Sequence, residues 1–228
     1  MTDKNRMTEI RKIRKAAASE KRLPNIDLPK PAFERERSLS NALTLRKTVR
    51  EFSARALSPR SLSNLLWAAW GVNRKKGPFG LPGRTSASAS SSQEIDLYVA
   101  LKEGVYLYDA PRHRLVPAAT GDLRALALNR GQGKLGIEAP VHLIYVADID
   151  KLSNTAGFRE PGLLDPEVQK SYYYVDTGLI AGNVYLFAAS QGLAAWFHNC
   201  QRTALADALR LRPDQRVLFA QTIGHPKK

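Results

Sequence analysis

Residues 141–147 spell Val-His-Leu-Ile-Tyr-Val-Ala, an almost continuous apolar run. A strand with one face in water alternates apolar and polar residues, so this run instead predicts a central strand covered on both faces. Residues 175–191 are also mostly apolar and are too long for a strand, which predicts a helix long enough to be buried. Together they predict a layered fold in which other elements cover a buried strand.

Two shorter helices are predicted near the start of the domain. Ser38 or Ser40 can cap a helix that ends near Arg46. Pro59 suits the first turn, and Gly71 the end, of a second helix. A Gly-, Pro- and Ser-rich stretch without a packing pattern follows at 73–93, and we expect it to be a loop.

The rest of the chain completes an α+β order of helices, a meander, a helix and more strands. We expect strands over 96–101, 105–108, 194–197 and 216–223, and one further helix over 203–211.

The length and apolar content favour one domain. The chain has 228 residues, 43% of them hydrophobic, which is enough for a sizeable core. No apolar run approaches the length of a membrane helix, and no apolar stretch follows the basic N-terminus as in a signal peptide. We therefore expect a cytoplasmic protein without membrane contact.

The net charge of +14 is concentrated at the N-terminus, where the first 50 residues hold fourteen Lys or Arg and six Asp or Glu. Residues 1–22 are basic, and a short helix or a frayed tail fits them equally well, since Ile10, Ile13 and Ala17 have helical spacing. Prolines in residues 23–37 favour an extended strap. We thus divide the chain into a tail and strap, 1–37, and a domain, 38–228.

A basic tail can bind nucleic acid, or part of the charge can neutralise an anionic cofactor. Because the tail has few aromatic residues to stack on bases, the nucleic-acid interpretation is the weaker of the two.

Common catalytic motifs are absent from the sequence. There is no Gly-x-Ser-x-Gly, no phosphate loop and no zinc-ligand spacing among the four histidines, so we expect no metal site. His142 lies in the apolar run and is expected to be a hydrogen-bonded core residue. Nothing in the sequence marks Cys200 as a nucleophile.

A cluster of cations stands out at the end of the first predicted helix. Arg46, Lys47, Thr48 and Arg50 combine guanidinium groups, an ammonium and a hydroxyl, which together suit a phosphate. A solvated basic helix end explains the cluster equally well.

Several segments in order resemble the nitroreductase-like FMN-dependent oxidoreductases, including their SagB-type branch. Similar stretches cover residues 38–228: 46–53, 65–73, 84–98, 104–109, 176–192 and 220–226. The resemblance implies an α+β sandwich, with a mostly antiparallel sheet flanked by helices, that forms a homodimer with FMN between subunits. It also implies ping-pong hydride transfer from NAD(P)H through flavin N5 to nitroaromatics, quinones or related acceptors.

The resemblance also assigns roles to residues. Arg46, Lys47, Thr48 and Arg50 would hold the phosphate and ribityl chain, and Ser88 and Ser91 would line the flavin from the partner subunit. Backbone groups of Phe197, His198, Asn199 and Cys200 would approach the flavin ring, and no dedicated catalytic acid or base is expected.

The second flavin segment departs from the family pattern. Ala87 stands in place of a proline and Ser91 in place of an asparagine, which loosens the backbone and removes an amide. Relatives also continue to further cationic phosphate ligands, where this chain has Lys227 and Lys228. Weaker FMN binding is therefore expected. Alternatives are a flavin-storage protein with little turnover, an azoline-type peptide dehydrogenase, and a nucleic-acid-binding protein that uses the tail.

Overall fold

The computed structural model describes residues 23–33, 38–129, 131, 133–155 and 165–227. The basic tail, for which a short helix and a frayed segment were equally expected, lies outside these ranges. None of the helices within them is long and apolar enough to cross a membrane.

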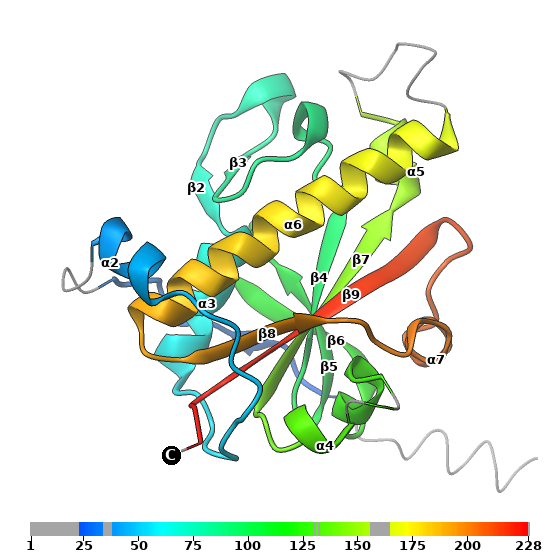
Figure 1. Ribbon diagram of the computed structural model, residues 1–228. Coiled ribbons are helices and arrows are strands. Elements are labelled where there is room, and N and C mark those ends of the chain that lie inside the picture. Colours follow the sequence, from blue (N-terminus) through cyan, green and yellow to red (C-terminus); the bar gives the residue numbers. More distant parts are fainter. Residues whose placement is uncertain (1–22, 34–37, 130, 132, 156–164, 228) are drawn as a thin grey trace, which may run out of the picture.

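One antiparallel sheet of seven strands organises the chain, in the order β1-β6-β5-β4-β7-β9-β8 (Figure 1). In chain order the strands are β1 Ile26–Asp27, β4 Ile95–Ala100, β5 Gly104–Asp109, β6 Arg114–Thr120, β7 Val141–Asp148, β8 Ala194–His198 and β9 Gln215–Gly224. The sheet and its helices confirm the predicted α+β class. The sequence did not predict β1 and β6.

β7 is an interior strand between β4 and β9, and all eight of its residues are buried. Leu143 and Tyr145 pack with α3 and α6 on one face, while Ile144 and Val146 pack with α7 on the other. The alternation arises because successive side chains of a strand point to opposite faces. The predicted double coverage of this segment is therefore confirmed.

The helices are α2 Leu39–Leu45, α3 Pro59–Trp70, α4 Gly133–Gly136, α5 Ile149–Ser153, α6 Pro166–Ser190 and α7 Arg202–Ala208. Predicted caps are present: the Ser38 hydroxyl accepts the Asn41 N–H (3.2 Å), and Gly71 ends α3. The hydroxyl of Ser58 accepts the Ser61 N–H at 3.1 Å.

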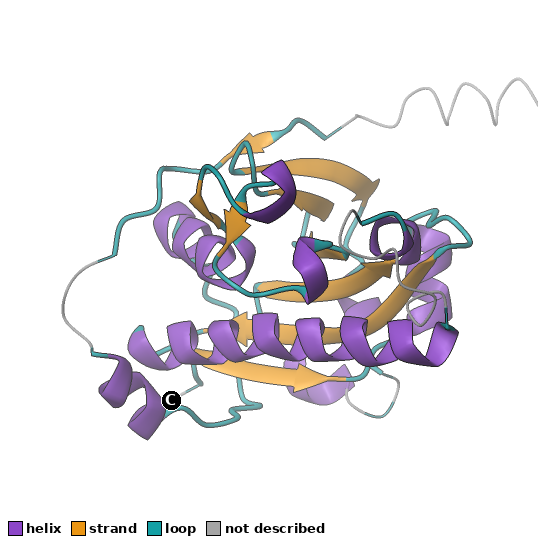
Figure 2. Cartoon of the chain, turned by 90° about the horizontal axis from the view of Figure 1, so that it is seen from above, coloured by secondary structure: helices purple, strands orange, loops and turns teal. Residues whose placement is uncertain are grey.

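α6 lies across one face of the sheet (Figures 1 and 2). It begins at Pro166, nine residues before the predicted start, and Asp165 caps it by accepting the Glu167 N–H at 2.9 Å. Its surface is only partly covered, since Val175 and Leu179 are 59% and 45% exposed.

The serine-rich stretch is more structured than expected. It contains a small sheet of β2 Val72–Arg74 and β3 Gly83–Arg84, and 3-10 turns at Pro78–Gly80 and Ala89–Ser91. A third 3-10 turn, Arg124–Ala127, lies after β6. The Arg84 guanidinium links the segment to the core by donating to Gln93 Oε1 (2.7 Å) and the Trp70 carbonyl (3.2 Å).

Residues 23–33 form the expected extended strap, and they pack on the domain. β1 pairs with β6, and the Ala32 N–H donates to Asn64 Oδ1 at 3.0 Å. The Phe33 ring lies 5.0 Å from the Trp67 ring on α3. The strap thereby covers one side of α3.

Candidate functional site

The cationic segment that follows α2 runs along β8 and the C-terminal half of α6. The Arg46 N–H closes α2 on the Ala42 carbonyl (2.9 Å), and the Val49 N–H donates to the Ala195 carbonyl (3.0 Å). Figure 1 shows α2 beside this end of α6. The backbone of 46–50 is therefore fixed, although its side chains reach solvent.

Aromatic rings support the two guanidinium groups. Arg46 Cζ lies 5.7 Å from the centre of the Tyr185 ring, and Arg50 Cζ lies 5.7 Å from the Trp196 ring. Within the described ranges neither guanidinium forms an ion pair with a carboxylate. Because cation–π contact leaves the N–H edges open, both groups can still bind an anion.

Tyr185 ties this segment to the end of β8. Its hydroxyl accepts the Phe197 N–H at 2.8 Å and lies 3.2 Å from the Thr48 hydroxyl. Tyr185 thus brings Arg46, Thr48 and the Phe197 backbone together, and Arg50 lies on the ring of the adjacent Trp196. Tyr185 and Trp196 were missed, because their contacts join positions far apart in the chain.

A pocket of about 380 Å³ lies against the cationic segment. Its lining combines apolar side chains with two ammonium groups: Leu45, Lys47, Val49, Tyr185, Ala188, Ala189, Gly192, Leu193, Pro226 and Lys227. Small-ligand sites typically have such a volume, with few polar groups on mostly apolar walls. Of the two lysines, Lys227 also forms an ion pair on the protein surface, with its Nζ 3.6 Å from Glu138 Oε2.

Hydrogen bonds hold the 87–91 segment in a defined shape. The Ala89 N–H donates to Asp176 Oδ2 (2.7 Å), and the Gln93 N–H donates to the Ser88 hydroxyl (3.2 Å). Ser90 and Ser91 adopt φ of 46° and 57°, in the left-handed region that costs a non-glycine residue energy. Ala87 is exposed, whereas Ser88 and Ser91 are half-buried.

A pair of carboxyl groups lies beneath this segment. Glu94 is fully buried, and its Oε2 accepts the Ser92 hydroxyl at 2.6 Å. Burial, and then the charge of Asp176, raise the pKa of Glu94 to about 8, and burial also raises the pKa of Asp176. Glu94 therefore keeps a proton at neutral pH, which lets it lie beside Asp176 without repulsion.

The two predicted flavin segments meet α6 at different points of one chain. Residues 46–50 contact Tyr185, and residues 87–91 contact Asp176, which is about 13 Å away at the helical rise of 1.5 Å per residue. A single chain therefore presents them as two separate surfaces on α6.

The remaining predicted residues lie at the end of β8 and just after it: His198 is the last residue of the strand, and Asn199 and Cys200 follow it. The His198 side chain is buried and points inward: its Nδ1 donates to the Asn199 carbonyl (2.9 Å), which leaves Nε2 to accept the Thr222 hydroxyl (2.7 Å). Asn199 is exposed, and Cys200 is buried. Burial raises the pKa of the Cys200 thiol to about 11, so the thiol is protonated at neutral pH.

His142 continues this buried row. Since the Thr222 hydroxyl donates its proton to His198, its oxygen accepts from His142 Nδ1 at 2.9 Å. Burial and the neighbouring His198 lower the pKa of His142 to about 3, so the ring is neutral. The expectation of a hydrogen-bonded core histidine is confirmed.

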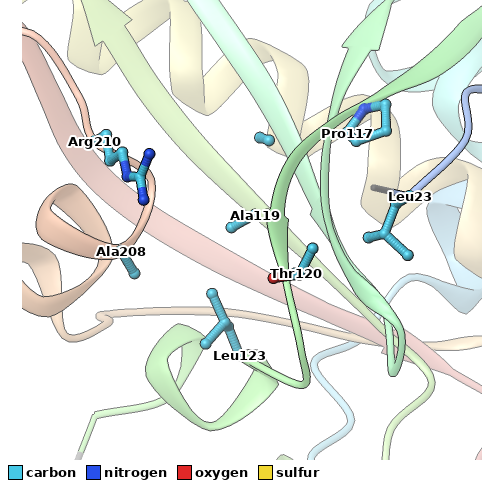
Figure 3. Close-up of a pocket in the computed structure, with 8 residues that line it drawn as sticks. Leu23, Pro117, Ala119, Thr120, Leu123, Ala208 and Arg210 are labelled. Atoms are coloured by element: carbon cyan, nitrogen blue, oxygen red, sulfur yellow. The ribbon is translucent and has the colours of Figure 1, made fainter. Parts of the chain in front are cut away.

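A larger cavity of about 630 Å³ lies elsewhere, near β6 and the end of α7 (Figure 3). Figure 3 shows mainly small and aliphatic side chains around it, together with Thr120 and Arg210. None of the predicted site residues lines this cavity, and among the described residues that line it Arg210 alone carries a charge. The chemistry therefore favours the surface along α6 as the functional site.

The carboxylates of Asp148, Asp150 and Asp214 are the one group in the described ranges with spacing suited to a metal. Arg212 Nη2 lies 2.9 Å from Asp148 and 3.1 Å from Asp214, so two of the three carboxylates form ion pairs with the same guanidinium.

Comparison with protein families gives a match to the Nitroreductase family over residues 43–225. A nitroreductase homologue from Methanocaldococcus jannaschii is 32% identical over 165 residues, which are 69% of this chain and 76% of the homologue.

Solved structures also include a nitroreductase relative of this chain. A nitroreductase homologue from Ralstonia eutropha superposes with a TM-score of 0.78 at 35% identity, over 90% of each chain. The NADPH:FMN oxidoreductase of Vibrio harveyi, complexed with NAD+, has the same fold, with a TM-score of 0.57 at 17% identity over 83% of this chain and 69% of that one.

Proposed function

The chain belongs to the nitroreductase family of oxidoreductases, and on that premise we propose that it is an FMN-dependent NAD(P)H oxidoreductase. Its substrates would be NAD(P)H and a small electron acceptor such as a nitroaromatic or a quinone. The observation that carries the proposal is that the Arg46 and Arg50 guanidinium groups lie on aromatic rings beside a pocket, without a carboxylate partner among the described residues.

The residues of the cationic segment fit the phosphate end of FMN. Phosphate is best recognised by guanidinium groups that bind it through two N–H groups, with a hydroxyl and a further positive charge nearby. Arg46 and Arg50 supply the first, Thr48 the hydroxyl, and Lys47 the additional charge. Lys227 lines the same pocket and fits the role expected of the C-terminal lysines.

Residues 197–200, at the end of β8 and just after it, would face the flavin ring with their backbone. Bound FMN supplies the hydride-transfer chemistry, and the protein holds it and sets its electrostatic surroundings. His198 orients this segment by its hydrogen bond to the Asn199 carbonyl. Because His198 is turned inward and the Cys200 thiol is buried and protonated, neither is placed as an acid or base.

A second copy of the chain would complete the site. The segment 87–91 meets α6 about 13 Å from the contact of residues 46–50, as a separate surface of the same chain. In line with the family resemblance, its Ser88 and Ser91 side chains would serve the partner's flavin. Large apolar side chains on α2 and α6 remain exposed, including Leu39 at 66% and Val175 at 59%. Apolar surface of this kind marks protein interfaces, which supports a homodimer.

The decisive experiment is flavin binding by the full-length protein, measured by titration of FMN with the Arg46→Gln/Arg50→Gln double variant. Each charge-assisted contact contributes about 1.5–3 kcal/mol, so the Kd for FMN should rise at least about 100-fold. Arg55→Gln, an exposed arginine on the same stretch, is the matched control and should bind as the wild type does. Unchanged affinity in the double variant would contradict the phosphate assignment.

NAD(P)H oxidation then separates an enzyme from a storage protein. A flavin-loaded protein should oxidise NADH or NADPH in the presence of a quinone or nitroaromatic acceptor. A yellow protein without this turnover would favour flavin storage.

A further inference from the structure

A groove of about 360 Å³ lies at the other end of α6 from the cationic segment. It is lined by residues of α6, α7 and β9: Tyr173, Tyr174, Arg202, Thr203, Ala206, Gln215, Arg216, Val217 and Leu218. No residue of 46–50 or 87–91 lines it, so it is separate from the proposed phosphate site.

Two exposed guanidinium groups flank the groove. Arg202 Cζ lies 5.3 Å from the Phe219 ring centre, and its Nη2 donates to Asn199 Oδ1 at 3.2 Å. Arg216 Nη1 donates to the carbonyls of Gln215, at 3.0 Å, and Pro213. In the described part of the chain neither is paired with a carboxylate, so both charges remain available to a ligand.

The two charges act on one point of the groove, the Tyr173 hydroxyl. Burial, and then Tyr174, raise the pKa of Tyr173, while the charges of Arg216 and Arg202 oppose that rise. Glu167 is the acidic group that also faces this phenol, and it lies 3.6 Å from Lys170 Nζ. The groove therefore combines a phenol donor with a net positive charge.

Aromatic rings connect the groove to the end of β8. Ring centres are 4.9 Å apart for Tyr173 and Tyr174, 5.8 Å for Tyr174 and Phe219, and 4.8 Å for Phe219 and Phe197. Arg202 reaches the same segment through Asn199. A ligand in the groove would thus extend along the rings toward the segment assigned to the flavin.

Flat rings bind aromatic surfaces, and guanidinium groups bind oxyanions. We propose that the groove flanked by Arg202, Arg216 and Tyr173 binds the anionic group of a flat aromatic redox substrate. The proposal rests on the proposed oxidoreductase function, which gives such a substrate its reaction. Two sources carry this chemistry: the phosphorylated adenosine end of NADPH, or an aromatic acceptor that bears a carboxylate.

The test compares each anionic compound with a neutral or less charged analogue in the Arg202→Gln/Arg216→Gln variant of the full-length protein. In ping-pong kinetics the kcat/KM values of donor and acceptor are independent. The pair NADPH and NADH therefore tests the electron donor, and the pair 4-nitrobenzoate and 4-nitrobenzamide separately tests the acceptor. Two charge-assisted contacts predict at least about a 100-fold loss for the anionic member of one pair and little change for its analogue. Arg210→Gln, an exposed arginine beside the cavity of Figure 3, is the control and should leave all four values unchanged.

The source of the anionic group is identified by the pair in which the double variant loses kcat/KM for the anionic compound and keeps it for the analogue. A loss shared equally by both members, or no loss in either pair, would overturn the groove as an anion site. Calorimetric titration of wild type and double variant with adenosine 2′-monophosphate and 4-nitrobenzoate requires no turnover. Binding in the wild type that the variant loses supports the groove even if the protein holds no flavin, whereas no binding of either probe contradicts the groove alone.

Discussion

The buried carboxyl pair under the serine-rich segment makes one prediction that reaches from the structure to a measurable free energy. Glu94 is fully buried beside Asp176, and its pKa is raised from 4.5 to about 8. The folded state therefore holds a proton that the unfolded state releases above pH 4.5. The free energy of unfolding should consequently fall as pH rises from there to about 8, and the decrease attributable to this group should then stop.

The magnitude follows from 1.36 kcal/mol per pKa unit, which gives about 1.4 kcal/mol per pH unit and at most about 5 kcal/mol in total. Glu94→Gln mimics the protonated carboxyl: its amide can accept from Ser92 and donate to Asp176. Between about pH 5.5 and about pH 7 the wild type should therefore lose about 2 kcal/mol of unfolding free energy that Glu94→Gln does not lose. The variant becomes more stable relative to the wild type by that amount.

Urea unfolding followed by tryptophan fluorescence measures this difference, at one fixed protein concentration because association would also shift stability. Glu103→Gln makes the same chemical change on an exposed side chain and should give a difference that is constant with pH. Parallel curves for wild type and Glu94→Gln would refute the reasoning, because they would mean that Glu94 is ionised in the folded protein at neutral pH.

Three further predictions concern the helices and the tail. Ser58→Ala removes the cap that accepts the Ser61 N–H and should cost about 1 kcal/mol in urea unfolding; no change would mean that the cap is replaced by water. Leu65→Ala, in the fully buried core under α3, should cost about 2–5 kcal/mol, and a loss well below that in calorimetry would argue against this packing. Deletion of residues 1–22 should leave the flavin absorbance at about 450 nm unchanged, since the flavin rather than the chain supplies that band; loss of flavin would show that the tail contributes to the site.

The sequence predicted best the elements whose signals are local. β7 was identified from its apolar composition, and α2 and α3 from serine caps and flanking proline and glycine. β6 was missed because Pro117 interrupts it and most of its residues are only partly buried, so it lacks a clear alternation. The first nine residues of α6 were missed because they are largely polar and aromatic.

The residues of the candidate site also fall into two groups, those that local sequence identifies and those whose role depends on the folded chain. Arg46, Thr48 and Arg50 could be found from composition and from resemblance to known flavoproteins. Tyr185 could not, because its role depends on contacts with Thr48 and Phe197 that only the folded chain creates. The buried position of Glu94 was equally hidden, since its charge predicts an exposed residue.

The strand order also dictates when this protein can fold during its synthesis. β8, at the edge of the described sheet, pairs with β9, which the ribosome makes later, after α7. Until β9 emerges and inserts beside β7, the apolar β8 with Trp196 and Phe197 has an unpaired edge. Nascent chains at that stage expose a hydrophobic strand to other polypeptides, so we expect them to be clients of chaperones until β9 is complete.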